Sequence, residues 1–188
     1  RFGGRAMPGN RVVKCTCGRV AMELTGQPIM TVECMCDSCR AAGAVLESLP
    51  GAPPLLDGKG ATLSAMYRKD RVECVGGEEH LREFRLRPES KTRRVVATCC
   101  NSAMFLEFTS GHWLDIFGRR WPPSEMPKPE MRTMVGDLPP GATLSGDVPN
   151  SRTHSLTFFA KLIGAWVAMR FRTPTITYVQ GELDAVPD

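Results

Sequence analysis

The sequence of 188 residues has no long hydrophobic run and no sequence feature of a secretory signal. Its longest uninterrupted apolar run covers the eight residues 162–169, whereas a helix that crosses a bilayer needs about 20. Residues 1–10 contain no apolar stretch and are interpreted as a disordered leader or an expression remnant. We therefore expect no transmembrane segment and a cytoplasmic location, where cysteines stay reduced.

The sequence also has little excess charge, with 24 Lys and Arg against 20 Asp and Glu, a net charge of +4. So small an excess does not indicate nucleic-acid binding. The densest basic stretch lies at 82–94 and is interrupted by Glu83 and Glu89, which favours a solvated strand face. Its cations are Arg82, Arg85, Arg87, Lys91, Arg93 and Arg94. A nucleic-acid partner is not expected.

Apolar residues make up 42% of the chain, so a domain of this size can build a core without metals or disulfides. Alternating apolar residues between turn signals predict a mainly β fold of several small antiparallel sheets plus one C-terminal helix. Strands are predicted at 11–25 with a bend at Gly18, and at 29–36, 72–75, 80–86, 93–98, 104–108, 113–117 and 175–179. The segment 40–49 fits a short helix or a strand.

The organisation changes after residue 117. Seven prolines between Pro122 and Asn150 predict an irregular insertion at 118–153. A helix follows at 154–172, with Thr153 as its candidate cap. Its apolar residues cover more than one stripe, which predicts burial in its own domain or against a partner, such as a homodimer contact through 154–170. The sequence thus divides into a β domain at 11–117, the insertion, the helix, and a closing strand and tail at 173–188.

The eight cysteines therefore need another explanation, and seven of them fall into three tight groups. They are Cys15 with Cys17, then Cys34, Cys36 and Cys39, and finally Cys99 with Cys100. The eighth, Cys74, is expected to be a buried structural thiol. A reducing compartment disfavours disulfides, and the absence of a βαβ context disfavours a redox role for Cys36 and Cys39.

The spacing favours two zinc sites. Residues i and i+2 of a strand point to one face, so Cys15 and Cys17 can chelate one ion, and so can Cys34 and Cys36. A turn would bring Cys39 back to the latter pair. The seven thiolates divide into two sites. Cys15 and Cys17 with the pair at 99–100 would form a closed structural site, and Cys34, Cys36 and Cys39 would form a three-ligand site with an open position. A fourth ligand from elsewhere would instead make the second site structural.

These motifs also resemble a known family. The segments Cys15-Thr16-Cys17-Gly18, Cys34-Met35-Cys36-Asp37-Ser38-Cys39-Arg40 and Cys100-Asn101-Ser102 are similar to the family of the glutathione-dependent formaldehyde-activating enzyme and centromere protein V. Gly181-Glu182-Leu183-Asp184 resembles the end of that family's domain. The resemblance implies antiparallel sheets around zinc sites. It places a structural zinc on the first and last groups and a catalytic zinc on Cys34, Cys36 and Cys39.

The sequence departs from the family pattern in three places. Ala97 stands where the family has a cysteine, so Cys99 would have to supply that sulfur through a bulge or turn at 99–100. Asn101 replaces a glycine, and asparagine still tolerates a left-handed conformation. The block at about 118–174 is absent from the usual family member and leaves the substrate open.

The resemblance implies the reaction that combines glutathione and formaldehyde through a carbon–sulfur bond. We therefore expect a zinc-dependent carbon–sulfur lyase-like enzyme with up to two zinc ions, which acts on a thiol adduct of a small aldehyde, with glutathione as the candidate co-substrate. Arg40 is the candidate partner of the glutathione carboxylates, and Phe159 and Trp166 are candidates to line a pocket over the zinc. The alternative is a non-catalytic zinc module for a protein or nucleic-acid partner.

Spacing alone identifies no proton carrier. The candidates are His80, His112 and His154, with Asp115, Asp137 and Asp184 as candidates to orient a base.

Overall fold

The computed structural model describes residues 9–126 and 128–184. Most of the predicted leader and the tail at 185–188 therefore lie outside the described residues. The strands are β1 (Asn10–Lys14), β2 (Ala21–Thr25), β3 (Met30–Cys34), β4 (Thr62–Arg68), β5 (Val72–Gly76), β6 (Leu81–Phe84), β7 (Thr92–Ala97), β8 (Ser102–Phe108), β9 (Trp113–Phe117) and β10 (Met131–Thr133). The two α-helices are α1 (Asp37–Glu47) and α2 (Leu156–Ala168). None of the described helices is long and apolar enough to span a membrane.

The strands form two sheets, which confirms the mainly β prediction. The larger sheet has the order β10-β3-β4-β9-β8-β7-β6, and the smaller has the order β1-β2-β5. Neighbouring strands are antiparallel except β10, which runs parallel to β3. The predicted bend at Gly18 is the turn of the β1–β2 hairpin, where this glycine has φ 78°.

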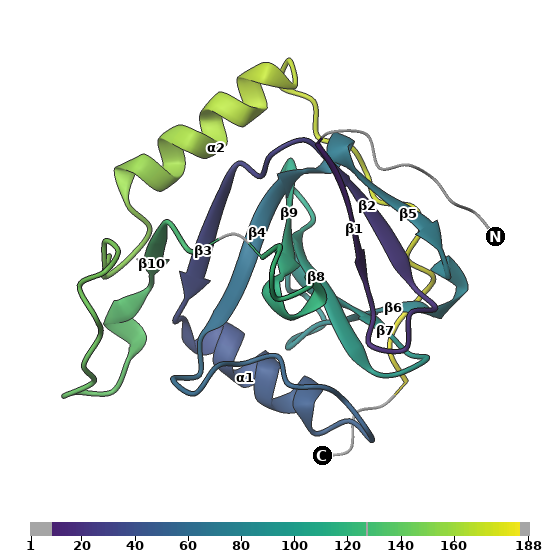
Figure 1. Cartoon of the computed structure of the whole chain (residues 1–188), viewed down its shortest axis with the longest axis horizontal. Helices are drawn as coiled ribbons and strands as arrows, with labels where there is room; N and C mark the ends of the chain where they lie inside the picture. The colour runs from purple at the N-terminus through teal and green to yellow at the C-terminus, as the bar shows by residue number, and fades with distance from the viewer. Residues whose placement is uncertain (1–8, 127, 185–188) are drawn as a thin grey trace.

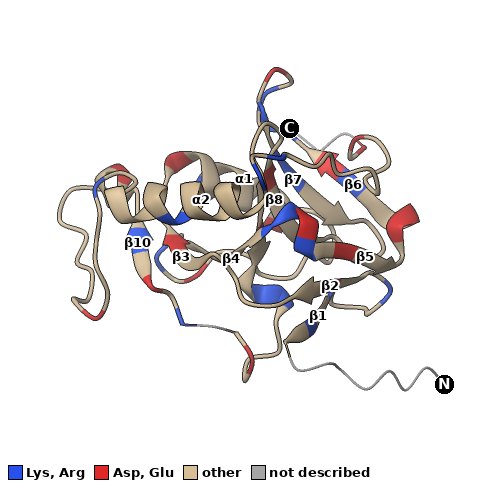
Figure 2. Ribbon diagram, turned by 90° about the horizontal axis from the view of Figure 1, so that it is seen from above, with Lys and Arg blue, Asp and Glu red and all other residues tan. Residues whose placement is uncertain are grey.

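The larger sheet is covered on both faces. Tyr67, Phe105 and Leu114 belong to one core with Met22 and Leu24 of the smaller sheet. The other face packs against the helices, α1 in a core with β7, β8 and β9, and α2 in a core with β3, β4 and β10. Figure 2 shows both helices on one side of the sheet and β1, β2 and β5 on the other. Figure 1 shows α2 and α1 at opposite ends of β3 and β4.

The sequence pattern did not reveal β4, although this strand lies near the centre of the larger sheet. Thr62, Ser64, Ala65, Met66 and Tyr67 are all buried. A strand covered on both faces loses the alternation of apolar and polar residues that makes half-buried strands recognisable. The polar members of this strand therefore disguised it.

Helix α1 begins earlier than the predicted segment 40–49. Cys36 is its cap, because its Sγ accepts a hydrogen bond from the Cys39 backbone N–H at 3.3 Å. The predicted tight turn at 36–39 is thus the first turn of a helix. Gly43 lets the helix lie close to Leu56, since an added Cβ would meet the Leu56 side chain at 2.5 Å.

Helix α2 is present, but the described chain itself buries only part of it, so the first alternative, burial within its own domain, is not found. Ser155 caps it instead of Thr153, with its Oγ accepting from the Phe158 N–H at 3.2 Å. Within the helix only Phe158 and Leu162 are buried. The outward side exposes large apolar residues, namely Leu156, Phe159, Ile163, Trp166 and Val167. The rest of the described chain thus covers only the stripe of the helix that holds Phe158 and Leu162. A homodimer contact through α2 stays a prediction.

Two further segments differ from expectation. The Pro-rich segment contains strand β10. Residues 131–133 lie between the prolines of this segment, so they are free to pair with β3. The predicted strand at 175–179 forms no regular strand. The pairing with β6 begins just after it, where Gln180 N–H donates to Leu81 O at 3.2 Å and Glu83 N–H donates to Gly181 O at 2.9 Å. Ile176 joins the core between the sheets.

A buried charge network replaces part of the predicted solvated basic face. Lys69 Nζ lies 2.6 Å from Glu107 Oε1, and neither side chain is more than 2% exposed. Arg93 forms an ion pair with each of two acids. Its Nε lies 2.6 Å from Glu107 Oε2, and its Nη1 lies 2.5 Å from Glu83 Oε2. Arg94 is 2% exposed. The predictions for Arg93 and Arg94 are therefore wrong, because both faces of β7 are covered.

The Lys69–Glu107 pair provides a test of the fold. Glu107→Gln removes the carboxylate and leaves the Lys69 ammonium buried without its counter-charge, which costs about 3–5 kcal/mol of unfolding free energy. The matched control is Glu130→Gln, since the Glu130–Lys161 pair is 44% and 35% exposed and contributes at most about 1 kcal/mol. Urea unfolding at saturating zinc measures both. Equal losses for the two variants would contradict the assignment of a buried network.

Candidate functional site

Four of the cysteines join the two sheets. Cys15 and Cys17 follow β1, and Cys99 and Cys100 lie in the turn between β7 and β8; we call these residues the four-cysteine cluster. Sulfurs at 2.3 Å from a tetrahedral zinc are about 3.8 Å apart. The Sγ atoms of Cys15 and Cys17 are 3.5 Å apart, those of Cys17 and Cys99 3.4 Å, and those of Cys15 and Cys99 3.8 Å. These thiols can hold one zinc ion.

The turn at 98–101 provides the bend that the departure at Ala97 required. Cys100 N–H donates to Ala97 O at 3.2 Å, and Asn101 has the left-handed φ of 49°. Two adjacent cysteines thereby point to the same cluster. The predictions for the 99–100 turn and for the left-handed conformation of Asn101 are confirmed. Both Cys99 and Cys100 belong to the group of four thiols that could hold a metal ion.

Cys34, Cys36 and Cys39 form a second group, the three-cysteine cluster, with their sulfurs within 4.8 Å of one another. Cys34 ends β3, Cys36 caps α1 and Cys39 lies in the first turn of this helix. Among the described residues, no histidine or carboxylate joins either group. The three-ligand set is the arrangement typical of a zinc with one open position.

The electrostatics of the three-cysteine cluster favour a cation. The pKa of Cys36 is lowered, chiefly by the thiols of Cys34 and Cys39, which stabilise its thiolate. The pKa of Cys39 is raised by those same neighbours and by burial. One thiolate is thus stabilised at the expense of the others, because negative charges so close together repel. A divalent cation removes that repulsion, so the donor set fits zinc.

The three-cysteine cluster lines a cavity of about 300 Å³, which we call the helix-side cavity. Alternate residues of the sheet point into it from its helix-covered face, and helices α1 and α2 provide the remaining walls. Its polar lining is Cys34, Cys36, Ser38, Cys39, Thr62, Ser64, Thr92, Arg94, Asp115, Thr133 and His154. Its apolar lining is Val32, Met66, Leu106, Trp113, Phe117, Met134, Phe158, Phe159 and Leu162.

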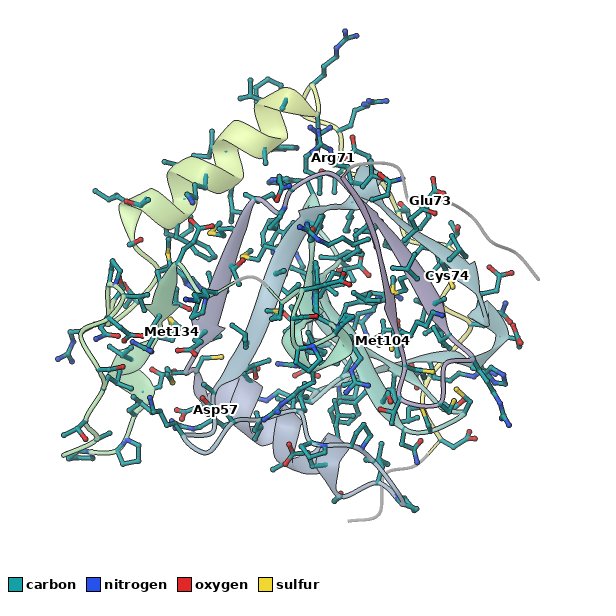
Figure 3. The ribbon with its side chains drawn as sticks, viewed as in Figure 1. Asp57, Arg71, Glu73, Cys74, Met104 and Met134 are labelled. Atoms are coloured by element: carbon teal, nitrogen blue, oxygen red, sulfur yellow. The ribbon has the colours of Figure 1, made fainter. Side chains whose placement is uncertain are left out.

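Figure 3 labels Met134, which directly follows β10 and contributes one wall of this cavity. Phe159 lines the cavity as the sequence predicted, but Trp166 is not among the lining residues. Trp166 instead stacks on His112, with the ring centroids 5.6 Å apart. Cys74, also labelled in Figure 3, lies on β5 and belongs to neither cysteine cluster. Burial raises the pKa of the Cys74 thiol.

The cation of the helix-side cavity is Arg94. Its Nη2 donates to Ser38 Oγ at 2.9 Å and to Ser38 O at 3.2 Å, which fixes the guanidinium at the start of α1. Arg40, the predicted contact of substrate carboxylates, pairs with Asp37 and donates to Asp137 O at 2.7 Å. Arg94 was missed because its basic neighbours suggested a solvated strand face. Arg94 and the apolar Val96 are two residues apart on one strand and so point to the same face, which could have indicated that Arg94 is buried.

Asp115 faces the same cavity from β9. Its Oδ1 is buried and has no hydrogen-bond partner. Burial raises the pKa of this carboxyl to about 7, while the neighbouring Arg94 acts in the opposite direction. A carboxyl with such a pKa can take up or release a proton near neutral pH. The sequence named Asp115 only as one of several acids, because chain spacing does not show which strand face points to the cysteines.

The histidines have distinct surroundings. His154 lines the cavity ahead of α2, and burial lowers its pKa. His112 is buried in the turn between β8 and β9, where its Nε2 donates to Leu162 O at 2.9 Å. His80 lies 3.5 Å from Glu79 and is outside the cavity. His154 is therefore the histidine that the structure brings to the cysteine cluster.

Metal content tests the two clusters. We expect about two zinc ions per chain by elemental analysis, and about one in Cys36→Ser with the far-UV circular dichroism unchanged, because Cys36 lies outside the four-cysteine cluster. Cys74→Ser is the matched control and should keep both ions. A wild-type content near one, unchanged in Cys36→Ser, would contradict zinc binding at the three-cysteine cluster.

The raised pKa of Asp115 predicts a pH effect on stability. The folded protein keeps a proton on Asp115 between the ordinary pKa of 3.8 and about 7, so its stability falls as the pH rises through that interval. Asp115→Asn removes this dependence. We expect the stability of the variant to gain on the wild type from pH 4 to pH 7 in chemical unfolding at constant zinc saturation. Parallel stability curves would contradict the shifted pKa.

Comparisons with known proteins agree with the motifs. The family model of the glutathione-dependent formaldehyde-activating enzyme matches residues 10–51. No protein with a curated description matches the chain significantly. A crystal structure of a Rhodobacter sphaeroides protein is 15% identical, with a TM-score of 0.44, and the alignment covers 74% of this chain and 99% of that one. The resemblance to the formaldehyde-activating family is thus confirmed over the segment that holds Cys15, Cys17 and the three-cysteine cluster.

Proposed function

We propose that this protein is a zinc-dependent carbon–sulfur lyase-like enzyme that makes or breaks the bond between a thiol and the carbonyl carbon of an aldehyde. The observation that carries the proposal is the three-cysteine cluster, which lacks a fourth ligand among the described residues and lies against a cavity with a buried acid and a cation. The family resemblance supports glutathione as the thiol. A cytoplasmic location, where glutathione is abundant, belongs to the same proposal.

Zinc held by Cys34, Cys36 and Cys39 would supply a soft Lewis-acid position that accepts a thiol sulfur and lowers its pKa. The chain supplies the proton transfer. In the adduct R–S–CH(OH)–R′, Asp115 removes the hydroxyl proton, the oxygen electron pair forms the carbonyl bond, and the carbon–sulfur electrons leave with the sulfur. In the reverse direction, the thiolate attacks the carbonyl carbon and protonated Asp115 returns the proton to the oxygen.

Arg94 has an electrostatic role in this proposal. It lies beside Asp115 and Cys36, and it acts to lower the pKa of both groups. A fixed guanidinium also stabilises the negative charge that develops on the substrate oxygen during addition. Arg40 lies outside the cavity lining and, in this proposal, contacts only the parts of a substrate that extend beyond α1.

The alternative function is a non-catalytic zinc module that binds a protein. The observation that favours it is the outward side of α2, where Leu156, Ile163 and Val167 are at least half exposed. Contiguous exposed apolar residues are typical of protein contact surfaces. The burial of Arg93 and Arg94 removes two cations from the stretch that nucleic acid would have used.

The proposed chemistry is tested with zinc-loaded protein and S-hydroxymethylglutathione, whose exchange with glutathione and formaldehyde is followed by NMR. We expect Asp115→Asn to lower the exchange rate about 10²–10⁴-fold, because it retains the shape but cannot accept a proton. Cys36→Ser should abolish the acceleration, and Cys74→Ser should leave it unchanged.

Failure of the fully zinc-loaded wild type to accelerate any thiol–aldehyde adduct would overturn the proposal. A zinc with four protein ligands at the three-cysteine cluster, seen by X-ray absorption, would also overturn it.

A further inference from the structure

The helix-side cavity is larger than formaldehyde itself requires, and much of its lining is apolar. Nine of its lining side chains are apolar, and its volume of about 300 Å³ falls within the range of cavities that hold ligands of many atoms. Formaldehyde contributes a single carbon. Most of the cavity must therefore be filled by the non-reacting part of the substrate, and the lining determines which chemistry that part has.

The strand register separates the two ends of this cavity. Cys34 lies opposite Thr62 and Val32 lies opposite Ser64, while Met66 is two residues further along β4. From Thr62 to Met66 the strand extends roughly 13 Å, at about 3.3 Å per residue. The sulfurs are thus at the α1 end, and the apolar end lies beneath α2.

The walls of the apolar end come from both the sheet and α2. Val32 and Met66 form one core with Phe158 and Leu162, and Trp113 packs against it. Phe159 completes the wall while remaining 49% exposed. None of these side chains offers a charge to a ligand.

Charge in the cavity disfavours the peptide part of glutathione. Arg94 is the one permanently cationic side chain among the lining residues, and it faces Asp115 and the Cys36 thiolate. His154 lies beside Phe158, with the ring centroids 4.4 Å apart, and burial lowers its pKa, which favours the neutral imidazole. Glutathione carries two carboxylates, whose transfer from water to this wall would leave at least one without a counter-charge. Such transfer is strongly unfavourable, whereas burial of a hydrocarbon group is favourable at about 25 cal/mol per Å².

We propose that the helix-side cavity selects substrates with an uncharged apolar group of about the size of a benzyl or hexyl group, bound beneath α2. This inference rests on the proposed function. The apolar group can belong to the thiol or to the aldehyde, because either places a hydrocarbon next to the reacting carbon–sulfur bond. Phe159 is the specificity-determining residue that is most open to substitution, since half of its surface already faces solvent.

Binding is the first readout and needs no turnover. Benzyl mercaptan and glutathione are titrated into the zinc-loaded protein by calorimetry. We expect benzyl mercaptan to bind at least about tenfold more tightly, from the burial of its ring. Phe159→Lys places an ammonium at the apolar end, and it should weaken benzyl mercaptan and strengthen glutathione.

The matched control is Ile163→Lys, one turn further along the exposed side of α2 and outside the cavity lining. This variant should bind both thiols as the wild type does. Equal or tighter binding of glutathione by the wild type would overturn the inference. So would an equal effect of the two lysine variants, because the cavity would then not be the place of selection.

Turnover distinguishes the source of the apolar group and separates this inference from the proposed function. The adducts compared are formaldehyde with benzyl mercaptan, hexanal with glutathione, and formaldehyde with glutathione. A higher kcat/KM for either of the first two supports the inference and identifies whether the thiol or the aldehyde carries the group. A preference for the third overturns the inference but supports the proposed function. Acceleration of none overturns the proposed function, whatever the binding data show.

Discussion

Mutual repulsion of closely placed thiolates is the constraint on which this structure depends. The four-cysteine cluster draws together the β1–β2 hairpin and the β7–β8 turn, and so connects the small sheet with the large one. The three-cysteine cluster connects the end of β3 with the start of α1. Neither arrangement is favourable for ionised sulfurs alone, and both become favourable around a divalent cation. A divalent cation bound at either cluster would therefore stabilise the placement of the elements that carry its cysteines.

The large sheet turns this placement into a site. Its two faces have different tasks, since one packs on the small sheet and the other carries the helix-side cavity. Cys34, Ser64, Arg94 and Asp115 come from four different strands, yet their parity directs all of them to the cavity. Helices α1 and α2 shield this common face from solvent. The resulting burial raises the pKa of Asp115 and places Arg94 beside it. A sheet covered on both sides thus provides a fixed and largely buried environment.

The local part of this arrangement was predictable from sequence, and the long-range part was not. The i and i+2 spacing of the cysteines, the division of seven thiolates into four and three, and the family resemblance predicted the two groups of sulfurs that the structure shows. Strand β4 was missed because burial on both faces removes alternation, and the role of Arg94 was missed because parity alone does not reveal what covers a face. The exposure of α2 was also unpredictable, since an apolar helix does not specify how much of its surface the rest of the chain will cover.

The attachment of α2 explains why it can act as a fixed wall. His112, in the β8–β9 turn, donates to Leu162 O and stacks on Trp166, so the middle of the helix is held to the large sheet. At its end, Arg170 and Phe171 both have positive φ, which is unfavourable for residues other than glycine. The Phe171 ring packs edge-on against Trp166, and its N–H donates to Trp166 O at 2.9 Å. A helix secured at these points keeps Phe158, Phe159 and Leu162 in position. Because these three side chains line the helix-side cavity, the position of α2 determines the shape of that wall.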